Sequence, residues 1–337
     1  MAPLNIFILG GTGYVGGTIL EDIFKRENFE ITVLVRSNEK ALALEALKLG
    51  SLHVVVGTAT DAAILETCVN KADIIIDTFN SDDVEGTAVL LGACKKRFDT
   101  TKEQIALIHV SGCAVLKDEA MGRYASDTIW DDTDTDKLAQ IPSTQPHREA
   151  DLEVLKADAA GYIKSYLVIP GAIYGHADTV LSQAGIQKDN DLGPRMSIGH
   201  TVALAGSPAA IGGGLNLWPW VHVEDVSSLI LTILDNLDNA PHGPEGYYFA
   251  ENIEIETGWP AAIAARSMGT SSPTVRAFTE EEVSKFFPPP YDIYAPLLAG
   301  NCRCRGTRAR RLGWKPKYDK DHLERDIARL TESIIKS

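Results

Sequence analysis

Residues 4–24 are LNIFILGGTGYVGGTILEDIF, and this stretch decides the fold. It begins with an apolar stretch in which a strand is predicted at Ile6–Leu9, and it continues into a glycine-rich turn at residues 10–17. Four apolar side chains at helical spacing come next: Ile19, Leu20, Ile23 and Phe24. A strand, a glycine turn and a helix in this order predict the first unit of an alternating β/α fold.

The same alternation continues as far as about Pro170. Further strands are predicted at Ile31–Val35, His53–Val56, Ile74–Phe79, Ala106–Val110 and Tyr166–Ile169. Between them lie helical patterns at Leu42, Leu44, Leu47 and Leu49, then at Val84–Phe98 and Glu149–Ala160. Nearly continuous apolar runs are typical of parallel strands that are buried on both faces. The fold class is therefore α/β, a Rossmann-type doubly wound parallel sheet with helices on both faces.

After Pro170 the alternation weakens, and glycine and proline become frequent. We expect a dinucleotide-binding Rossmann domain at residues 1–175, to which residues 221–253 return through a helix at Val226–Leu237. Residues 176–220 and 254–337 are expected to form a smaller C-terminal lobe that caps a substrate over the strand ends.

Composition limits the classes of partner. The net charge of −14 argues against nucleic acid and against anionic membranes, because both would repel this chain. No apolar run reaches the roughly 20 residues that span a bilayer, and Leu4–Leu9 is too short for a signal peptide, so a cytoplasmic location is expected. The five cysteines are expected to be free thiols, and Cys302-x-Cys304 lacks partner ligands, so no metal is expected. A homodimer is the one self-association that we consider.

The glycine turn has the chemistry of a diphosphate site. Backbone N–H groups at a helix N-terminus bind phosphate, and close approach requires residues without a Cβ. Its expected contacts to a nicotinamide dinucleotide are Gly10, Gly11, Thr12, Gly13, Tyr14, Val15 and Gly16.

The end of the second predicted strand indicates which dinucleotide binds. Arg36 lies about 20 residues after Gly16, where an acidic residue usually binds the NAD ribose and an arginine pairs with a 2′-phosphate instead. This favours NADP, with NAD as the alternative if Arg36 is a solvated charge or stacks on adenine. Asp61 is a candidate partner for the adenine amino group, or else a helix N-cap.

Four motifs in order resemble the short-chain dehydrogenase/reductase superfamily, in its extended, epimerase/dehydratase-like branch. They are Leu9–Gly16 (with Leu9 for the usual threonine), Ile169–Gly175, Val221–Val226 and Arg311–Pro316. The resemblance implies that the nicotinamide passes Pro170, Ala172 and Ile173, with Phe79 and Ser111 nearby.

The family's Tyr-x-x-x-Lys pair has no match where the resemblance places it. His147 takes the tyrosine's place and Asp151 the lysine's, while Gly112 holds the catalytic serine position and Ser111 lies beside it. His147 and Asp151 are either an acid–base pair on one helix face, since imidazole titrates near neutrality, or an ordinary N-terminal helix pair. Tyr124 is either another acid or a loop aromatic.

Two functions follow from these patterns. The first is an NAD(P)-binding oxidoreductase or epimerase-like enzyme that acts on a small-molecule carbonyl or alcohol, and a complete second lobe favours it. The alternative is a non-catalytic NADP(H)-binding sensor or regulatory protein, which the unmatched Tyr and Lys favour.

Overall fold

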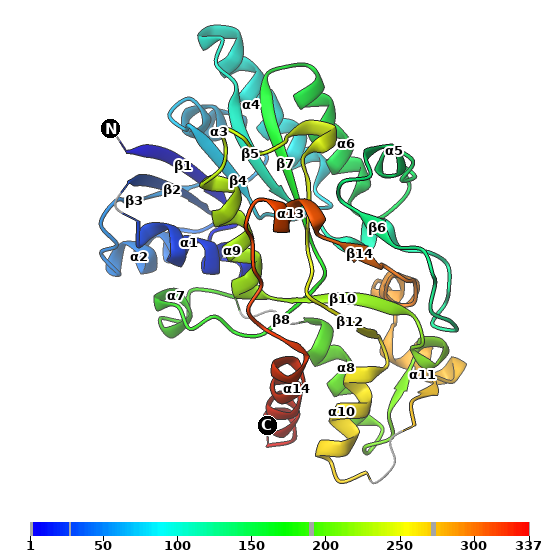
Figure 1. Cartoon of the computed structure of the whole chain (residues 1–337). Helices are drawn as coiled ribbons and strands as arrows, with labels where there is room; N and C mark the ends of the chain where they lie inside the picture. Colours follow the sequence, from blue (N-terminus) through cyan, green and yellow to red (C-terminus); the bar gives the residue numbers. More distant parts are fainter. Residues whose placement is uncertain (1–2, 27, 189–191, 271–273, 337) are drawn as a thin grey trace.

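The computed structural model describes residues 3–26, 28–188, 192–270 and 274–336. Its centre is one parallel sheet with the strand order β11-β7-β5-β4-β1-β2-β3 (Figure 1). The strands are β1 (Leu4–Leu9), β2 (Phe29–Val35), β3 (Leu52–Val56), β4 (Ile74–Asp77), β5 (Ile105–Val110), β7 (Ile163–Pro170) and β11 (Tyr247–Ala250). The order reverses between β1 and β4, which confirms the doubly wound fold and creates the crevice where such folds bind ligands.

Helices cover both faces of this sheet because alternate side chains of each strand are buried on opposite sides. Ile6 and Ile8 pack in one core with α1 (Tyr14–Phe24), α2 (Asn38–Ala46) and α9 (Val223–Leu234). Phe7 and Leu9 pack in another core with α3 (Ala62–Val69), α4 (Val84–Thr101) and α6 (Arg148–Ala159). The sheet is therefore buried on both faces, as the continuous apolar runs predicted.

The six predicted strands are confirmed, with bounds that differ from the predicted ones by up to three residues. Strand β4 ends at Asp77, two residues earlier than predicted, and the Thr78 N–H donates to Leu9 O (3.0 Å) across the sheet. The four-residue strand β11, which pairs with β7, was not predicted. Leu42, expected on an apolar helix face, is 66% exposed, because α2 buries Ala41 and Leu44 instead.

A smaller unit lies across the carboxyl ends of the central strands (Figure 1). Its sheet has the order β12-β10-β8, with β12 (Ile253–Glu256), β10 (Leu217–His222) and β8 (Ala172–Tyr174). Its helices are α8 (Leu192–Ala203), α10 (Trp259–Ser267), α11 (Glu280–Phe286), α12 (Tyr294–Leu298) and α14 (Lys320–Lys336). Helix α10 packs against both α8 and α14. We refer to this unit as the lobe.

Short elements complete the chain. The short helices are α5 (Thr135–Leu138), α7 (Val180–Gln183) and α13 (Thr307–Arg311). Two short strand pairs also form: β6 (Trp130–Asp131) pairs with β14 (Cys304–Arg305), and β9 (Ala209–Ala210) pairs with β13 (Arg276–Ala277). None of the helices in the described ranges is both long and apolar enough to cross a membrane.

Two segments, one directly after β10 and one near the C-terminus, return to the Rossmann core. Helix α9 packs against α1, and α13 packs against β11. Trp314, which is fully buried, joins the two segments because its indole N–H donates to Asp225 O (3.0 Å) and Ser228 Oγ (2.9 Å) of α9. This residue therefore ties the C-terminal part of the chain to the Rossmann core.

Removing this side chain should destabilise the whole protein. We expect Trp314→Ala to lower the free energy of unfolding by about 3–5 kcal/mol, the usual cost of deleting a buried aromatic ring. Urea denaturation followed by circular dichroism measures this change. Leu42→Ala, on the exposed face of α2, is the control and should change it by less than about 0.5 kcal/mol. Equal stability of the two variants would contradict this account of Trp314.

Candidate functional site

The glycine turn brings β1, α1 and β4 into direct backbone contact. Gly10 has φ +80°, and a Cβ built there would lie 2.6 Å from Thr78 O. A Cβ on Gly16 would lie 2.2 Å from Gly10 O, whereas one on Gly13 would lie 3.0 Å from the same atom. Gly10 and Gly16 are therefore needed by the fold itself, whereas at Gly13, the N-cap of α1, a Cβ would make only one tight contact.

A small cavity of about 150 Å³ opens beside Gly13 and the end of β2. Three cationic side chains line it: Arg36, Lys40 and Lys188. Lys40 Nζ lies 3.2 Å from Thr12 Oγ1, and the Lys188 N–H donates to Thr12 O (3.1 Å). Partial burial, together with the charges of Lys188 and Arg36, lowers the pKa of Lys40. These three charges repel one another, so an anion in this cavity would relieve the repulsion. We refer to it as the cationic cavity.

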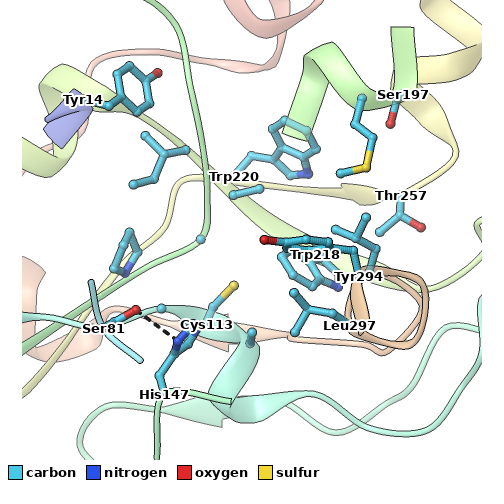
Figure 2. A pocket seen from close by; sticks show the side chains of 18 of the residues that line it. Tyr14, Ser81, Cys113, His147, Ser197, Trp218, Trp220, Thr257, Tyr294 and Leu297 are labelled. Carbon is cyan, nitrogen blue, oxygen red and sulfur yellow. Dashed lines mark hydrogen bonds between the residues drawn. The ribbon is translucent and has the colours of Figure 1, made fainter. Parts of the chain in front are cut away.

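A second cavity, of about 520 Å³, lies between the carboxyl ends of the central strands and the lobe. It is lined by the residues that follow β4, β5 and β7, which include Phe79, Ser111, Pro170, Ala172 and Ile173. Thr78 and Phe79 also line the cationic cavity, so the two cavities adjoin. We refer to the larger one as the main cavity, and Figure 2 shows it from close by.

His147 lines the main cavity and is held by one ring nitrogen. Its Nδ1 lies 2.8 Å from Asp82 Oδ1 and 3.1 Å from Ser81 Oγ (Figure 2 shows the bond to Ser81). The hydrogen bond from His147, opposed in part by burial, lowers the pKa of Asp82. Asp82 is therefore an ionised acceptor at neutral pH, which places the proton of a neutral imidazole on Nδ1.

The other ring nitrogen of His147 faces Gly112. A Cβ on Gly112 would lie only 2.9 Å from Nε2, so any larger residue at this position would displace the ring. His147 itself is the N-cap of α6 with φ +65°, a left-handed conformation, and its backbone N–H donates to Asp82 Oδ1 (3.0 Å). The imidazole is thus fixed by Asp82 on one side and given room by Gly112 on the other.

Asp151 is not the partner of His147, contrary to the hypothesis of a pair at i and i+4. Asp151 is fully buried and accepts a hydrogen bond from Ser111 Oγ (3.1 Å). Its Oδ1 lies 3.7 Å from His109 Nε2, and His109 Nδ1 lies 2.9 Å from Asp77 Oδ2. The reason is geometric, because His147 caps the helix in a left-handed conformation while Asp151 points inward from its first turn.

Burial and neighbouring charges shift the pKa values of Asp151 and His109. Burial raises the pKa of Asp151, and the nearby His109 and the Ser111 hydrogen bond offset part of that effect. Burial alone would lower the pKa of His109, but its hydrogen bond to Asp77 and the charges of Asp77 and Asp151 raise it overall. The series of contacts from Asp77 through His109 and Asp151 ends at the hydroxyl of Ser111, a residue that lines the main cavity.

Two other predicted residues lie outside both cavities. Tyr124 is 54% exposed and lines neither cavity, although its carbonyl oxygen accepts a hydrogen bond from Asn301 (3.2 Å). Asp61 caps α3, because its carboxylate accepts a hydrogen bond from the Ile64 N–H (3.2 Å). Within the described ranges, no three His, Cys, Asp or Glu side chains come together in a way that could hold a metal ion.

Comparison with known proteins gives a consistent assignment. A family model described as NAD(P)H-binding matches residues 10–156. The oxidase ucsJ of Acremonium sp is 24% identical over 334 residues, which cover 93% of this chain and 92% of that protein. A decarboxylating sterol-4-alpha-carboxylate 3-dehydrogenase, erg26, of Schizosaccharomyces pombe is 22% identical over 276 residues, covering 78% and 74%.

The fold agrees with a solved structure over almost its whole length. The dTDP-glucose 4,6-dehydratase of Bacillus anthracis, in complex with NAD, superposes with a TM-score of 0.68 at 18% identity, covering 99% of this chain and 97% of that one. Residues 10–156 thus match an NAD(P)H-binding family, and the whole chain has the fold of this dehydratase. Its distant relatives include an oxidase and a dehydrogenase.

Several residues of the site were missed by the sequence predictions. Lys40 carries a detectable signal, because it lies only four residues after Arg36, in the first turn of α2. His109 carries another, because it lies two residues before Ser111 and so shares its side of β5. Asp82 and Lys188 carry none, because only the fold brings them to His147 and Thr12.

The role of the glycine turn can be tested at Gly13. We expect Gly13→Ala to weaken NADPH binding at least about tenfold, because its Cβ occupies the path of the diphosphate, while the fold survives. Isothermal calorimetry measures the affinity, and thermal unfolding checks the fold. Gly92→Ala is the matched control, since a Cβ there meets no atom within 4 Å. Unchanged affinity in a folded Gly13→Ala protein would refute the assignment of this turn.

Proposed function

We propose that this protein is an NADP(H)-dependent oxidoreductase that interconverts a carbonyl and an alcohol in a small molecule, with His147 as its proton donor and acceptor. The observation that carries the proposal is the fixed imidazole. Asp82 and Ser81 hold Nδ1, and Nε2 lies beside Gly112 in the wall of the main cavity.

The residues present fit the diphosphate and the nicotinamide of a dinucleotide. Gly13 and the N-terminus of α1 would hold the diphosphate, and Phe79, Ser111, Pro170, Ala172 and Ile173 would border the nicotinamide. When bound, the cofactor supplies or accepts a hydride. Pro170, Ala172 and Ile173 follow the carboxyl end of β7, the edge at which such folds bind ligands.

The preference for NADP(H) rests on the cationic cavity. Arg36, Lys40 and Lys188 line it together, and a 2′-phosphate is the part of NADP(H) that NAD(H) lacks. No acidic side chain lines this cavity within the described part of the chain, so a ribose hydroxyl of NAD(H) would find no carboxylate acceptor there. The charges therefore favour the phosphorylated cofactor.

His147 performs both directions of proton transfer. With Nδ1–H directed at Asp82, the Nε2 lone pair of a neutral imidazole accepts the proton of a substrate alcohol during oxidation. During reduction the protonated ring returns that proton to the carbonyl oxygen. Asp82 is thus a positioning residue that holds the ring orientation and its tautomer.

Ser111 supplies a second polar contact near the same place. Because its hydroxyl hydrogen is directed at Asp151, its oxygen lone pairs face the main cavity as acceptors for a substrate hydroxyl. Asp151 and His109, both buried, act through Ser111 and are positioning residues.

Replacing the imidazole should stop turnover and spare cofactor binding. We expect His147→Gln to reduce kcat by about 10²–10⁴-fold, the usual contribution of positioned proton transfer, with the NADPH affinity unchanged. Asp82→Asn should reduce kcat less, because the ring remains but its orientation loosens. Steady-state consumption of NADPH over a panel of aldehydes and ketones measures both effects.

A histidine elsewhere serves as the control. His53→Gln, on the exposed side of β3, should retain full activity. Full activity in His147→Gln would rule out its role as the acid. Tight NADPH binding without turnover of any compound by the native protein would instead favour the sensor function.

Cofactor choice is tested by removing one charge. NADPH should bind at least about tenfold more tightly than NADH, and Arg36→Ser should reduce that ratio about tenfold, since a charge-assisted contact contributes ~1.5–3 kcal/mol. Calorimetry with both cofactors measures the ratio. Lys96→Ser, which removes a charge on α4, should leave it unchanged. Equal affinity of the native protein for the two cofactors would contradict the preference.

A further inference from the structure

The main cavity extends from the strand ends far into the lobe. Trp218 of β10, Phe278, Phe287, Tyr294, Leu297 and His200 of α8 line this extension. In Figure 2, Trp218, Tyr294 and Leu297 gather on one side of the cavity, away from His147 and Ser81. We refer to this part as the lobe chamber.

The wall of the main cavity carries no side-chain charge. Lys, Arg, Asp and Glu form 23% of the whole sequence, yet none of them is among the described residues that line it. A charged group placed there would lose its hydration without gaining a partner of opposite charge, which is strongly unfavourable. The chamber therefore selects against phosphate, carboxylate and ammonium groups.

His200 is the one imidazole among the residues that line the lobe chamber, and it adds no charge to the wall of the chamber. Its ring stacks on Phe286 (4.4 Å between centroids) and meets Phe278 and Phe287 edge to face (5.5 and 5.3 Å). Burial among these rings lowers the pKa of His200 to about 4, so the imidazole is neutral at physiological pH. No hydrogen bond joins it to any residue that the structure describes, which leaves its ring nitrogens as a polar contact for a bound molecule.

The size of the cavity is appropriate for a ligand with rings. The main cavity, at about 520 Å³, falls within the 300–1,000 Å³ that is usual for small-molecule sites, and part of it borders the nicotinamide. Flat aromatic walls pack best against rings, because stacking and edge contacts add to the burial of apolar area.

We propose that the substrate is an uncharged, hydrophobic, ring-containing carbonyl compound or alcohol, whose ring system lies in the lobe chamber while the reacting oxygen meets His147. This inference rests on the proposed function for the reaction and on the wall of the chamber for the substrate class. A sugar nucleotide is excluded by the same wall, because its diphosphate would find no cation there.

The first test measures binding without turnover. The protein is saturated with NADP⁺, with which a ketone cannot be reduced, and titrated with 2-acetylnaphthalene, 6-acetyl-2-naphthoic acid and UDP-glucose. Quenching of tryptophan fluorescence reports occupancy, because Trp218 and Trp220 line the cavity. We expect the neutral ketone to bind at least about tenfold more tightly than its carboxylate, and UDP-glucose not to bind.

The second test introduces a charge into the chamber. Leu297→Lys should weaken binding of 2-acetylnaphthalene about tenfold or more and strengthen binding of the carboxylate, so that the preference inverts. Ile293→Lys is the matched control, since Ile293 lies on the preceding turn with 65% of its surface exposed, and should behave as the native protein does. Unchanged NADPH affinity in both variants shows that they fold.

The outcomes separate the two proposals. Equal or tighter binding of the carboxylate or of UDP-glucose by the native protein, or no binding of the neutral ketone, overturns the substrate class. An unchanged preference in Leu297→Lys overturns it as well. If the neutral ketone binds selectively but NADPH is not consumed in its presence, the substrate class stands and the proposed reaction fails.

Discussion

Gly10, Gly16 and Thr78 meet where no Cβ fits between them. The Thr78 hydroxyl donates to Leu9 O (2.7 Å), and a Cβ on Gly16 would lie 2.5 Å from that hydroxyl. This contact fixes the start of α1 against the ends of β1 and β4, at the point where the strand order reverses. Both cavities border on Thr78, so their relative position follows from the same contact.

The position of the His147 ring depends on a similar exchange of space. In the resemblance to the family, Gly112 stands at the serine position, and the structure puts the His147 ring where a side chain at 112 would begin. Ser111, one residue earlier, turns instead to the buried Asp151. The positions that the resemblance assigns to the family's tyrosine and serine thus hold His147 and Gly112, and a side chain at 112 would take the space of the imidazole ring.

The alternating β/α part of the fold was predictable because its buried strands are apolar runs in the sequence. Glycine and acidic residues at the N-caps mark where helices begin. Strand β11 was missed because it lies beyond Pro170, where the alternation of strands and helices weakens in the sequence. Helix α8 contains Gly193, Pro194 and Gly199, which hide its helical character in the sequence. Motif spacing singled out Arg36 and His147, and each of them lines one of the two cavities. The hydrogen bond from His147 to Asp82 was not predictable, because it joins two loops that meet only in three dimensions.

The left-handed backbone at His147 has a consequence for the trade-off between stability and activity. A non-glycine residue in this conformation costs on the order of 1 kcal/mol, which glycine would not incur. Selection for stability alone would therefore drift toward glycine or asparagine at this position. A natural variant that lost its function would be free to take that step, so a more heat-resistant descendant of this protein should be sought among its inactive forms.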